Sequence, residues 1–213
     1  QGHKFYVDER VIVPRSYIGE LLGQRLEAII PDPEGVRRVL DLCTGSGCLA
    51  ILAALAFPNA KVDAAEISTD ALAVAKKNVA DYSLENRVRL MKSDLFAALG
   101  GERYDLILSN PPYVSASAMA AFPPEYRAEP ALAHAGGEDG LDIVRRILTE
   151  AGRHLSPDGT LVVEIGTGRD LLEAKFPALP FLWLDTETSE GEVFALTAEA
   201  LAEQTAKPRQ IRK

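Results

Sequence analysis

The chain has 213 residues, with 23 basic and 31 acidic side chains and a formal net charge of −8. This length suits one well-buried core rather than two full domains, and the acidic balance argues against a protein that holds nucleic acid through its overall field. No apolar run approaches the roughly 20 residues that cross a bilayer, and two cysteines are too few for a disulfide scaffold. We therefore expect a cytoplasmic protein without a membrane segment, which binds a small molecule or a basic partner.

Strand-like and helix-like segments alternate along most of the chain. Strands are expected at residues 36–43, 60–67, 88–95, 104–110 and 160–166, and helices at residues 48–57, 70–82 and 140–154. Two further strand-like runs, 181–186 and 192–197, are joined by so short a turn that they should pair antiparallel. The sequence thus predicts an α/β fold, in which a seven-stranded, mostly parallel sheet carries helices on both faces and ends in an antiparallel hairpin.

Three regions are expected along the chain. Residues 31–200 should form the sheet domain, residues 1–30 should lead into it, and residues 201–213, which end in a run rich in Lys and Arg, should be a disordered basic tail. In open α/β sheets ligands bind at the carboxyl ends of the strands, and the unusual residue clusters of this sequence all follow such ends.

The first of these clusters is a glycine-containing loop, DLCTGSG, at residues 41–47. Gly45 and Gly47 let the backbone turn sharply and approach a ligand, although alone they also fit a dinucleotide loop or a plain strand-to-helix turn. The carboxylate of Asp41 would repel a pyrophosphate and attract a cation. S-adenosylmethionine carries an ammonium and a sulfonium and no phosphate, so it fits this loop better than a dinucleotide does.

Two more carboxylates lie at the ends of the second and third expected strands. Glu66 is placed to accept hydrogen bonds from ribose hydroxyls, and Asp94 is placed to accept one from an adenine amino group. Each also has a plainer interpretation, Glu66 as a solvated carboxylate before a helix and Asp94 as a loop or cap residue. Together they favour a nucleoside ligand without deciding which one.

The most specific motif is Asn110-Pro111-Pro112-Tyr113, which follows the fourth expected strand. Residues before proline are pushed to extended geometry, and proline itself has a fixed φ and no N–H, so Asn110 should project rigidly over the strand end. The side-chain oxygen of Asn110 and the carbonyl of Pro111 can then accept both hydrogens of a planar NH2 group, on which Tyr113 can stack. The alternative is a strand-terminating turn, which Asn and Pro form routinely.

This arrangement suits methylation of an amide or an exocyclic amine. Such a nitrogen is a poor nucleophile because its lone pair is delocalised. Two acceptors that polarise the NH2 group and aim its lone pair at a methyl donor stabilise the developing positive charge and preorganise the attack. No strong general base is needed, because the methylated nitrogen becomes acidic and loses its proton afterwards.

With these motifs the chain resembles the class I, Rossmann-like methyltransferases that use S-adenosylmethionine. Within them it resembles the HemK-type protein-glutamine N(5)-methyltransferases, and in particular the branch that methylates a glutamine of ribosomal protein L-three. The segments that carry the resemblance are residues 5–16 (FYVDERVIVPRS), 41–48 (DLCTGSGC), 110–114 (NPPYV), 125–130 (EYRAEP) and 136–141 (GGEDGL). Asn-Pro-Pro-Tyr alone is shared with methyltransferases of adenine and guanine amino groups.

The resemblance implies a cofactor, a reaction and a set of site residues. It implies transfer of a methyl group from S-adenosyl-L-methionine to the side-chain amide nitrogen of a glutamine, in a basic ribosomal protein that is expected to be L-three of the large subunit. The implied cofactor-binding residues are Asp41, Thr44, Gly45, Gly47, Glu66, Asp94 and Leu95. The implied substrate-binding residues are Asn110, Pro111, Pro112, Tyr113, Arg15 and Arg127, of which Asn110, Pro111 and Tyr113 are the expected catalytic residues.

Three departures from the family pattern bear on these expectations. Cys43 stands where the first glycine of the loop is usual, and Glu66 stands where many relatives have the shorter Asp. The family's amino-terminal helical domain, which docks the substrate, is absent from this sequence. We therefore expect cofactor binding with weakened methylation.

Three other functions stay open on the sequence. A methyltransferase acting on a nucleobase amino group of RNA or DNA is the main alternative, against which the sequence shows no basic stripe. A nicotinamide-dependent oxidoreductase and a non-catalytic module with the same fold are the others. No metal site is expected, because Cys43 and Cys48 lack C-x-x-C spacing. His3, His134 and His154, like Arg145 and Arg146, are expected on solvated surfaces, and the oligomeric state is undecided.

Overall fold

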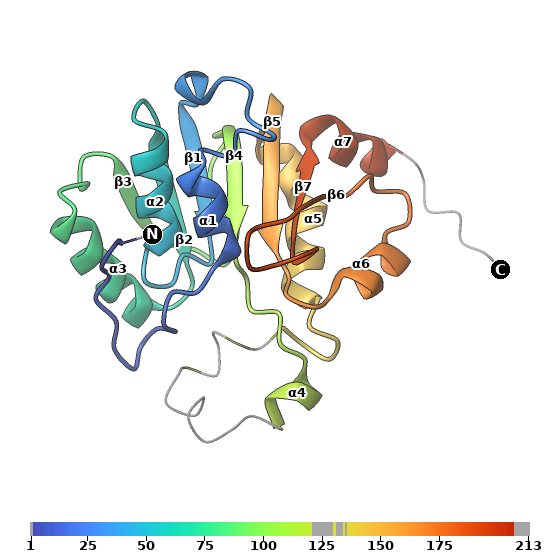
Figure 1. Cartoon of the computed structure of the whole chain (residues 1–213), viewed down its shortest axis with the longest axis horizontal. Helices are drawn as coiled ribbons and strands as arrows, with labels where there is room; N and C mark the ends of the chain where they lie inside the picture. Colours follow the sequence, from blue (N-terminus) through green and yellow to red (C-terminus); the bar gives the residue numbers. More distant parts are fainter. Residues whose placement is uncertain (1, 121–129, 131–133, 135, 207–213) are drawn as a thin grey trace.

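The computed structural model describes residues 2–120, 130, 134 and 136–206, and its centre is one seven-stranded sheet (Figure 1). The strand order is β3-β2-β1-β4-β5-β7-β6. The strands are β1 (Arg38–Leu42), β2 (Lys61–Glu66), β3 (Val88–Lys92), β4 (Tyr104–Ser109), β5 (Leu155–Glu164), β6 (Leu182–Leu184) and β7 (Val193–Thr197). β1 to β5 run parallel, whereas β7 pairs antiparallel with both β5 and β6, which confirms the expected hairpin.

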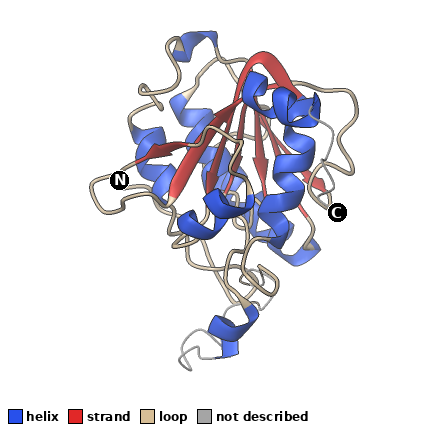
Figure 2. Cartoon of the chain, turned by 90° about the vertical axis from the view of Figure 1, so that its right-hand side faces the viewer, coloured by secondary structure: helices blue, strands red, loops and turns tan. Residues whose placement is uncertain are grey.

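Helices cover both faces of this sheet (Figure 2). They are α1 (Tyr17–Gly23), α2 (Cys48–Ala56), α3 (Thr69–Asp81), α4 (Ala116–Ala120), α5 (Asp142–His154), α6 (Arg169–Lys175) and α7 (Ala198–Ala206), with a 3-10 turn at Pro33–Gly35. α3 begins after Ser68, whose hydroxyl oxygen accepts a hydrogen bond from the Ala71 N–H at 3.2 Å. This is the N-cap geometry that leaves one fewer backbone donor unpaired at a helix start.

The strands sort their side chains into two buried cores, as the period of two in a strand requires. On β4, Leu106 and Leu108 pack with α1 and α2 on one face, while Ile107 between them packs with α5 on the other. Every residue of β4 except Asp105 is buried. A strand covered on both faces is typical of a parallel sheet, and it explains the nearly continuous apolar run of this segment.

The topology brings the carboxyl ends of β1 to β4 to one edge. β1 is the switch point, because the chain proceeds from β1 to β2 and β3 on one side and to β4 and β5 on the other. In Figure 1 the chain leaves the end of β4 at this edge and continues to α4 below the sheet. The loops that carry the sequence motifs therefore meet here.

Three sequence expectations need correction. The segment 1–30 is more than a lead-in, because it contains α1, whose Ile18 and Leu22 belong to the same buried core as α2. Residues 201–206 belong to α7 rather than to a disordered tail, and residues 207–213 lie outside the described residues. The fifth strand was expected at residues 160–166, whereas β5 begins at Leu155 and ends at Glu164.

Candidate functional site

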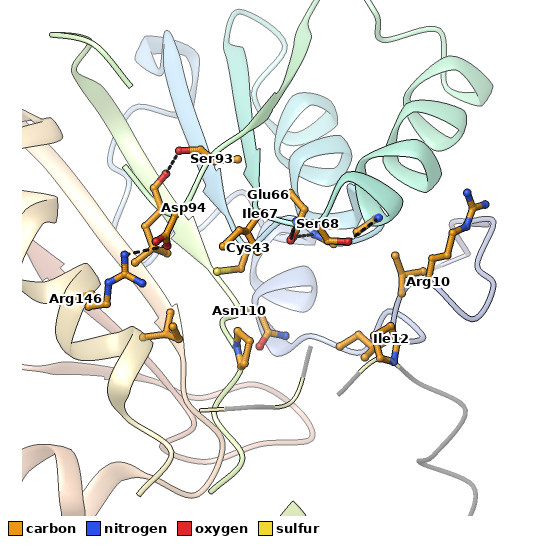
Figure 3. A pocket seen from close by; sticks show the side chains of 18 residues that line it. Arg10, Ile12, Cys43, Glu66, Ile67, Ser68, Ser93, Asp94, Asn110 and Arg146 are labelled. Carbon is orange, nitrogen blue, oxygen red and sulfur yellow. Dashed lines mark hydrogen bonds and ion pairs between the residues drawn. The ribbon is translucent and has the colours of Figure 1, made fainter. Parts of the chain in front are cut away.

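A cavity of about 210 Å³ opens at the carboxyl edge of the sheet (Figure 3). Its walls come from the loops after β1, β2, β3 and β4, from α5, and from an extended segment before α1. Of the residues expected from the sequence, those that line it are Gly45, Glu66, Asp94, Leu95, Asn110 and Pro112. Residues far apart in the sequence thus meet around one space, as the switch-point rule predicts.

The glycine loop reaches the cavity through three left-handed backbone positions. Cys43, Gly45 and Gly47 have φ values of 59°, 54° and 80°. A Cβ on Gly47 would lie 3.2 Å from the Cβ of Ala75, so the loop rests directly against α3. Glycine suits both the left-handed backbone and the close approach to α3, because it has no Cβ. Cys43 adopts the left-handed conformation although residues with a side chain rarely do.

Asp41 lies beneath this loop and does not line the cavity. Its side chain is completely buried, and the Thr44 hydroxyl donates a hydrogen bond to its Oδ2. The other carboxylate oxygen, Oδ1, has no hydrogen-bond partner among the described residues. Burial raises the pKa of Asp41 to about 7, because it penalises the charged form. Thr44 and Gly47 likewise support the loop without lining the cavity.

Glu66 links the loops after β1 and β2. One carboxylate oxygen accepts from the Gly45 N–H at 3.0 Å, and the other accepts from the Ser68 N–H at 2.9 Å. The side chain is therefore fixed beside the cavity rather than solvated, which excludes the plainer interpretation of Glu66. Since each carboxylate oxygen has two lone pairs, both oxygens keep accepting capacity toward a ligand.

At another side of the cavity Asp94 pairs with Arg146 of α5, with 2.9 Å between Asp94 Oδ1 and an Arg146 guanidinium nitrogen. Figure 3 shows this pair on the opposite side of Asn110 from Ile12. Arg146 is exposed, as the sequence predicts, but its side chain also lines the cavity, which the sequence did not indicate. A local pattern could not reveal a pair of residues 52 positions apart.

Asn110 lines the cavity, whereas the other end of its motif is anchored away from it. Pro111 is buried, and the Tyr113 hydroxyl donates to Glu164 Oε1 at 3.4 Å. Glu164, at the end of β5, also accepts from the Ser16 hydroxyl at 2.7 Å and from the Tyr17 N–H at 2.9 Å. Burial raises the pKa of both Tyr113 and Glu164. These contacts join the motif to the start of α1.

Glycines enclose Tyr113 and explain part of the glycine-rich segment at 136–141. A Cβ on Gly140 would lie 2.4 Å from the Tyr113 carbonyl oxygen, and one on Gly136 would lie 2.8 Å from its carbonyl carbon. From the loop after β5, a Cβ on Gly166 would lie 2.8 Å from the Tyr113 ring. Any larger residue at these positions would have to displace the motif.

Replacing Gly166 by alanine is therefore expected to lower both stability and turnover. The backbone there has φ of 55°, and the new methyl would overlap the Tyr113 ring. We expect a loss of about 1–3 kcal/mol in the free energy of unfolding and of about 10-fold in turnover. Urea titration and a methylation assay measure the two. Gly101→Ala is the matched control, because a Cβ there meets nothing within 4 Å; equal effects of both changes would contradict the enclosure of Tyr113.

One wall of the cavity comes from residues that the sequence did not single out as site residues. We call residues 4–12 the N-terminal arm; its Arg10, Val11 and Ile12 line the cavity. Val7 and Val11 pack on Ala71 and Val74 of α3, so the arm is held apart from the sheet by a helix. The resemblance over residues 5–16 was the signal that could have indicated this wall.

The remaining expected residues lie elsewhere. Arg15 is exposed and does not line the cavity, and Arg127 lies outside the described residues, as does most of segment 125–130. His134 is buried rather than on the surface, and His154 is half-buried and stacks on Phe96 with ring centres 4.7 Å apart.

Within the described ranges no group of three His, Cys, Asp or Glu residues could hold a metal ion. None of the described helices has the length and apolarity needed to span a membrane.

Comparison with known proteins gives consistent matches. A family model described as the methyltransferase small domain matches residues 20–122. A ribosomal protein uL3 glutamine methyltransferase of Bradyrhizobium diazoefficiens is 62% identical over 94% of this chain and 65% of its own length. Proteins of the same name from Burkholderia pseudomallei and Bordetella pertussis are both 58% identical over 94% of this chain and 67% of their own length. The chain thus spans about two thirds of these relatives.

Solved structures of low sequence identity share the fold. The ribosomal protein L11 methylase of Lactobacillus delbrueckii subsp. bulgaricus is similar with a TM-score of 0.58 at 21% identity, over 87% of this chain and 79% of that one. The N-terminal domain of human METTL16 in complex with SAH is similar with a TM-score of 0.63 at 18% identity, over 92% of this chain and 76% of that one. The expected class I methyltransferase fold is confirmed.

Proposed function

Because the chain belongs to the family of ribosomal protein uL3 glutamine methyltransferases, we propose that it methylates the side-chain amide nitrogen of a glutamine in ribosomal protein uL3, with S-adenosylmethionine as the donor. The observation that carries this proposal is the composition of one cavity. Gly45 and Glu66, suited to a nucleoside, and Asn110, suited to a planar NH2 group, line the same space. A methyl transfer requires both partners in contact.

The residues around the cavity fit such a donor. The oxygens of Glu66 keep lone pairs for two ribose hydroxyls, and Asp94 keeps its Oδ2 for an adenine amino group. Asp41 places a carboxyl group with an unpaired oxygen beneath the glycine loop, and its charged form, which predominates above its pKa of about 7, favours a cation above the loop. Thr44, Gly47 and Leu95 would shape the same region. The donor supplies an electrophilic methyl group on a positively charged sulfur.

On the acceptor side, Asn110 and Pro111 would accept the two hydrogens of the glutamine carboxamide. Their oxygens polarise the NH2 group and stabilise the positive charge that develops on its nitrogen during attack. Tyr113 was expected to stack on the carboxamide but does not line the cavity, so its proposed role is to keep the Asn-Pro-Pro-Tyr segment rigid through its anchoring to Glu164. Pro112 would complete the wall, and Arg15 and Arg127 would contact the substrate protein.

Charge supports a protein rather than a nucleic acid as the substrate. The chain has a net charge of −8, whereas ribosomal proteins are generally basic, so its field would attract such a partner. The reaction would occur in the cytoplasm, where both thiols of the chain stay free. We assign donor binding to residues 31–200 together with the N-terminal arm.

Mass spectrometry of ribosomal protein uL3 incubated with the chain and S-adenosylmethionine tests this function. A single added methyl group on one glutamine is the expected result, and uL3 in which that glutamine is replaced by alanine is the matched control. A parallel reaction with ribosomal RNA tests the alternative substrate. Methyl transfer to RNA in the absence of any transfer to uL3 would contradict the proposal.

A further inference from the structure

Asn78 of α3 is a buried polar side chain that makes three hydrogen bonds to two segments distant in sequence. It is 1% exposed. Its Oδ1 accepts from the Tyr6 N–H at 2.8 Å, while its Nδ2 donates to the Tyr6 carbonyl at 3.0 Å and to the Ser46 carbonyl at 2.8 Å. One amide thus binds both backbone groups of Tyr6 and one of Ser46.

The two segments that Asn78 joins both contribute to the walls of the cavity. Ser46 lies between the two glycines of the loop after β1, and Gly45 lines the cavity. Tyr6 belongs to the N-terminal arm, which continues to Arg10, Val11 and Ile12, three residues that also line the cavity. Among the described residues, no hydrogen bond between backbone groups connects the arm directly to the glycine loop.

α3 supports both walls through apolar contacts as well. The close approach of Gly47 to Ala75 holds the loop on the helix, and the packing of Val7 and Val11 on Ala71 and Val74 holds the arm there. Apolar contacts tolerate sliding, because they have no directional preference. Asn78 adds directional bonds that fix the arm and the loop at one register.

We propose that Asn78 is a positioning residue for donor binding, which sets the separation of the arm and the glycine loop. This inference rests on the proposed function, because it takes the cavity as the donor site. Asn78 touches neither the donor nor the acceptor; it acts through Ser46 and Tyr6. Its removal would leave the buried Ser46 carbonyl and the two partly buried backbone groups of Tyr6 without this partner, and would let both segments shift.

Calorimetric titration of the chain with S-adenosylhomocysteine tests this role. Asn78→Ala is expected to raise the dissociation constant about 10-fold or more, and in turnover the loss should appear in KM for the donor more than in kcat. Tyr82→Phe is the matched control. The Tyr82 hydroxyl bonds both backbone groups of Lys4 at 3.1 Å, so it anchors the same arm from the C-cap of the same helix without touching the loop. We expect less than a twofold change for it.

The outcomes separate the inference from the function on which it rests. If the unaltered chain does not bind S-adenosylhomocysteine, the proposed function fails. If it binds and a folded Asn78→Ala binds equally well, only the role of Asn78 is overturned. If Asn78→Ala does not fold, hydrogen exchange in the unaltered chain tests whether the arm and the glycine loop are coupled. The ligand should then slow the Tyr6 and Gly47 amides together, and an unchanged Tyr6 amide would refute the coupling.

Discussion

Replacing Asn110 by alanine is expected to lower kcat about 100-fold or more, while the dissociation constant for S-adenosylhomocysteine changes less than about twofold. The reason is that the Asn110 oxygen would bind the acceptor NH2 group more strongly as positive charge develops on it. The side chain sits at the end of β4 with prolines on its following side, so its loss should leave the surrounding backbone in place.

Single-turnover methylation of uL3 and calorimetric titration measure these two quantities. Asn86→Ala is the matched control, because this exposed asparagine lies just before β3, at the amino-terminal edge of the sheet, and should change neither. If Asn110→Ala weakens ligand binding as much as it lowers turnover, its side chain has a structural role instead.

Asp41→Asn is expected to change how stability depends on pH. In the folded chain the pKa of Asp41 is raised to about 7, whereas an unfolded aspartate titrates near 4. Below about pH 4 the carboxyl is protonated in both states. Between pH 4 and 7 the folded state holds the proton that the unfolded state has lost, so stability falls as pH rises, and above pH 7 the loss is complete.

The contribution of Asp41 to the pH dependence of stability can be measured by comparing the unaltered chain with Asp41→Asn. Relative to Asp41→Asn, the unaltered chain should lose up to about 4 kcal/mol of unfolding free energy between pH 4 and 8. Urea titrations across this range give the difference, in which other carboxyls such as Glu164 cancel because both chains contain them. Parallel pH curves would show that Asp41 is not held protonated by burial.

The same substitution tests the electrostatic role of Asp41. An asparagine keeps the shape but not the charge, so affinity for S-adenosylmethionine at pH 8 should fall about 10-fold. Affinity for the uncharged-sulfur product should fall less, because only the ammonium then remains to be attracted. Equal affinity of both chains for the donor would contradict the argument that this carboxylate selects a cation.

The sheet could be predicted from sequence because its strands are short apolar runs that end at strong local signals. Residues 104–110 illustrate this, since Pro111 and Pro112 end the strand abruptly. The prediction began β5 at Thr160, whereas the strand starts at Leu155 and includes Pro157 and Gly159, with an irregular register against β4. Pro157 and Gly159 are residue types that usually form turns. Their place within β5 follows only from the pairing of this strand with β4.

α1 was not predicted, and its sequence shows why. It has seven residues, YIGELLG, of which two are glycines with low helix propensity. Its stability comes from burying Ile18 and Leu22 against α2 and from the bonds of Ser16 and Tyr17 to Glu164. These contacts span long sequence separations and leave no local pattern.

The candidate site was predictable where a loop follows a strand and hidden where the contact is tertiary. Glu66 ends β2, Gly45 and Asn110 follow β1 and β4, and all three line the cavity. Arg146 and the N-terminal arm reach it from α5 and across α3, and their sequences resemble ordinary surface segments. Asp41 follows the same rule as Gly45, but its side chain turns beneath the loop.

A crystal structure of the chain with bound S-adenosylhomocysteine tests the central claim most directly. The account predicts the ligand in the cavity, with its ribose hydroxyls within hydrogen-bonding distance of Glu66 and its sulfur facing the side-chain oxygen of Asn110. A ligand bound elsewhere, or one whose sulfur points away from Asn110, would contradict it.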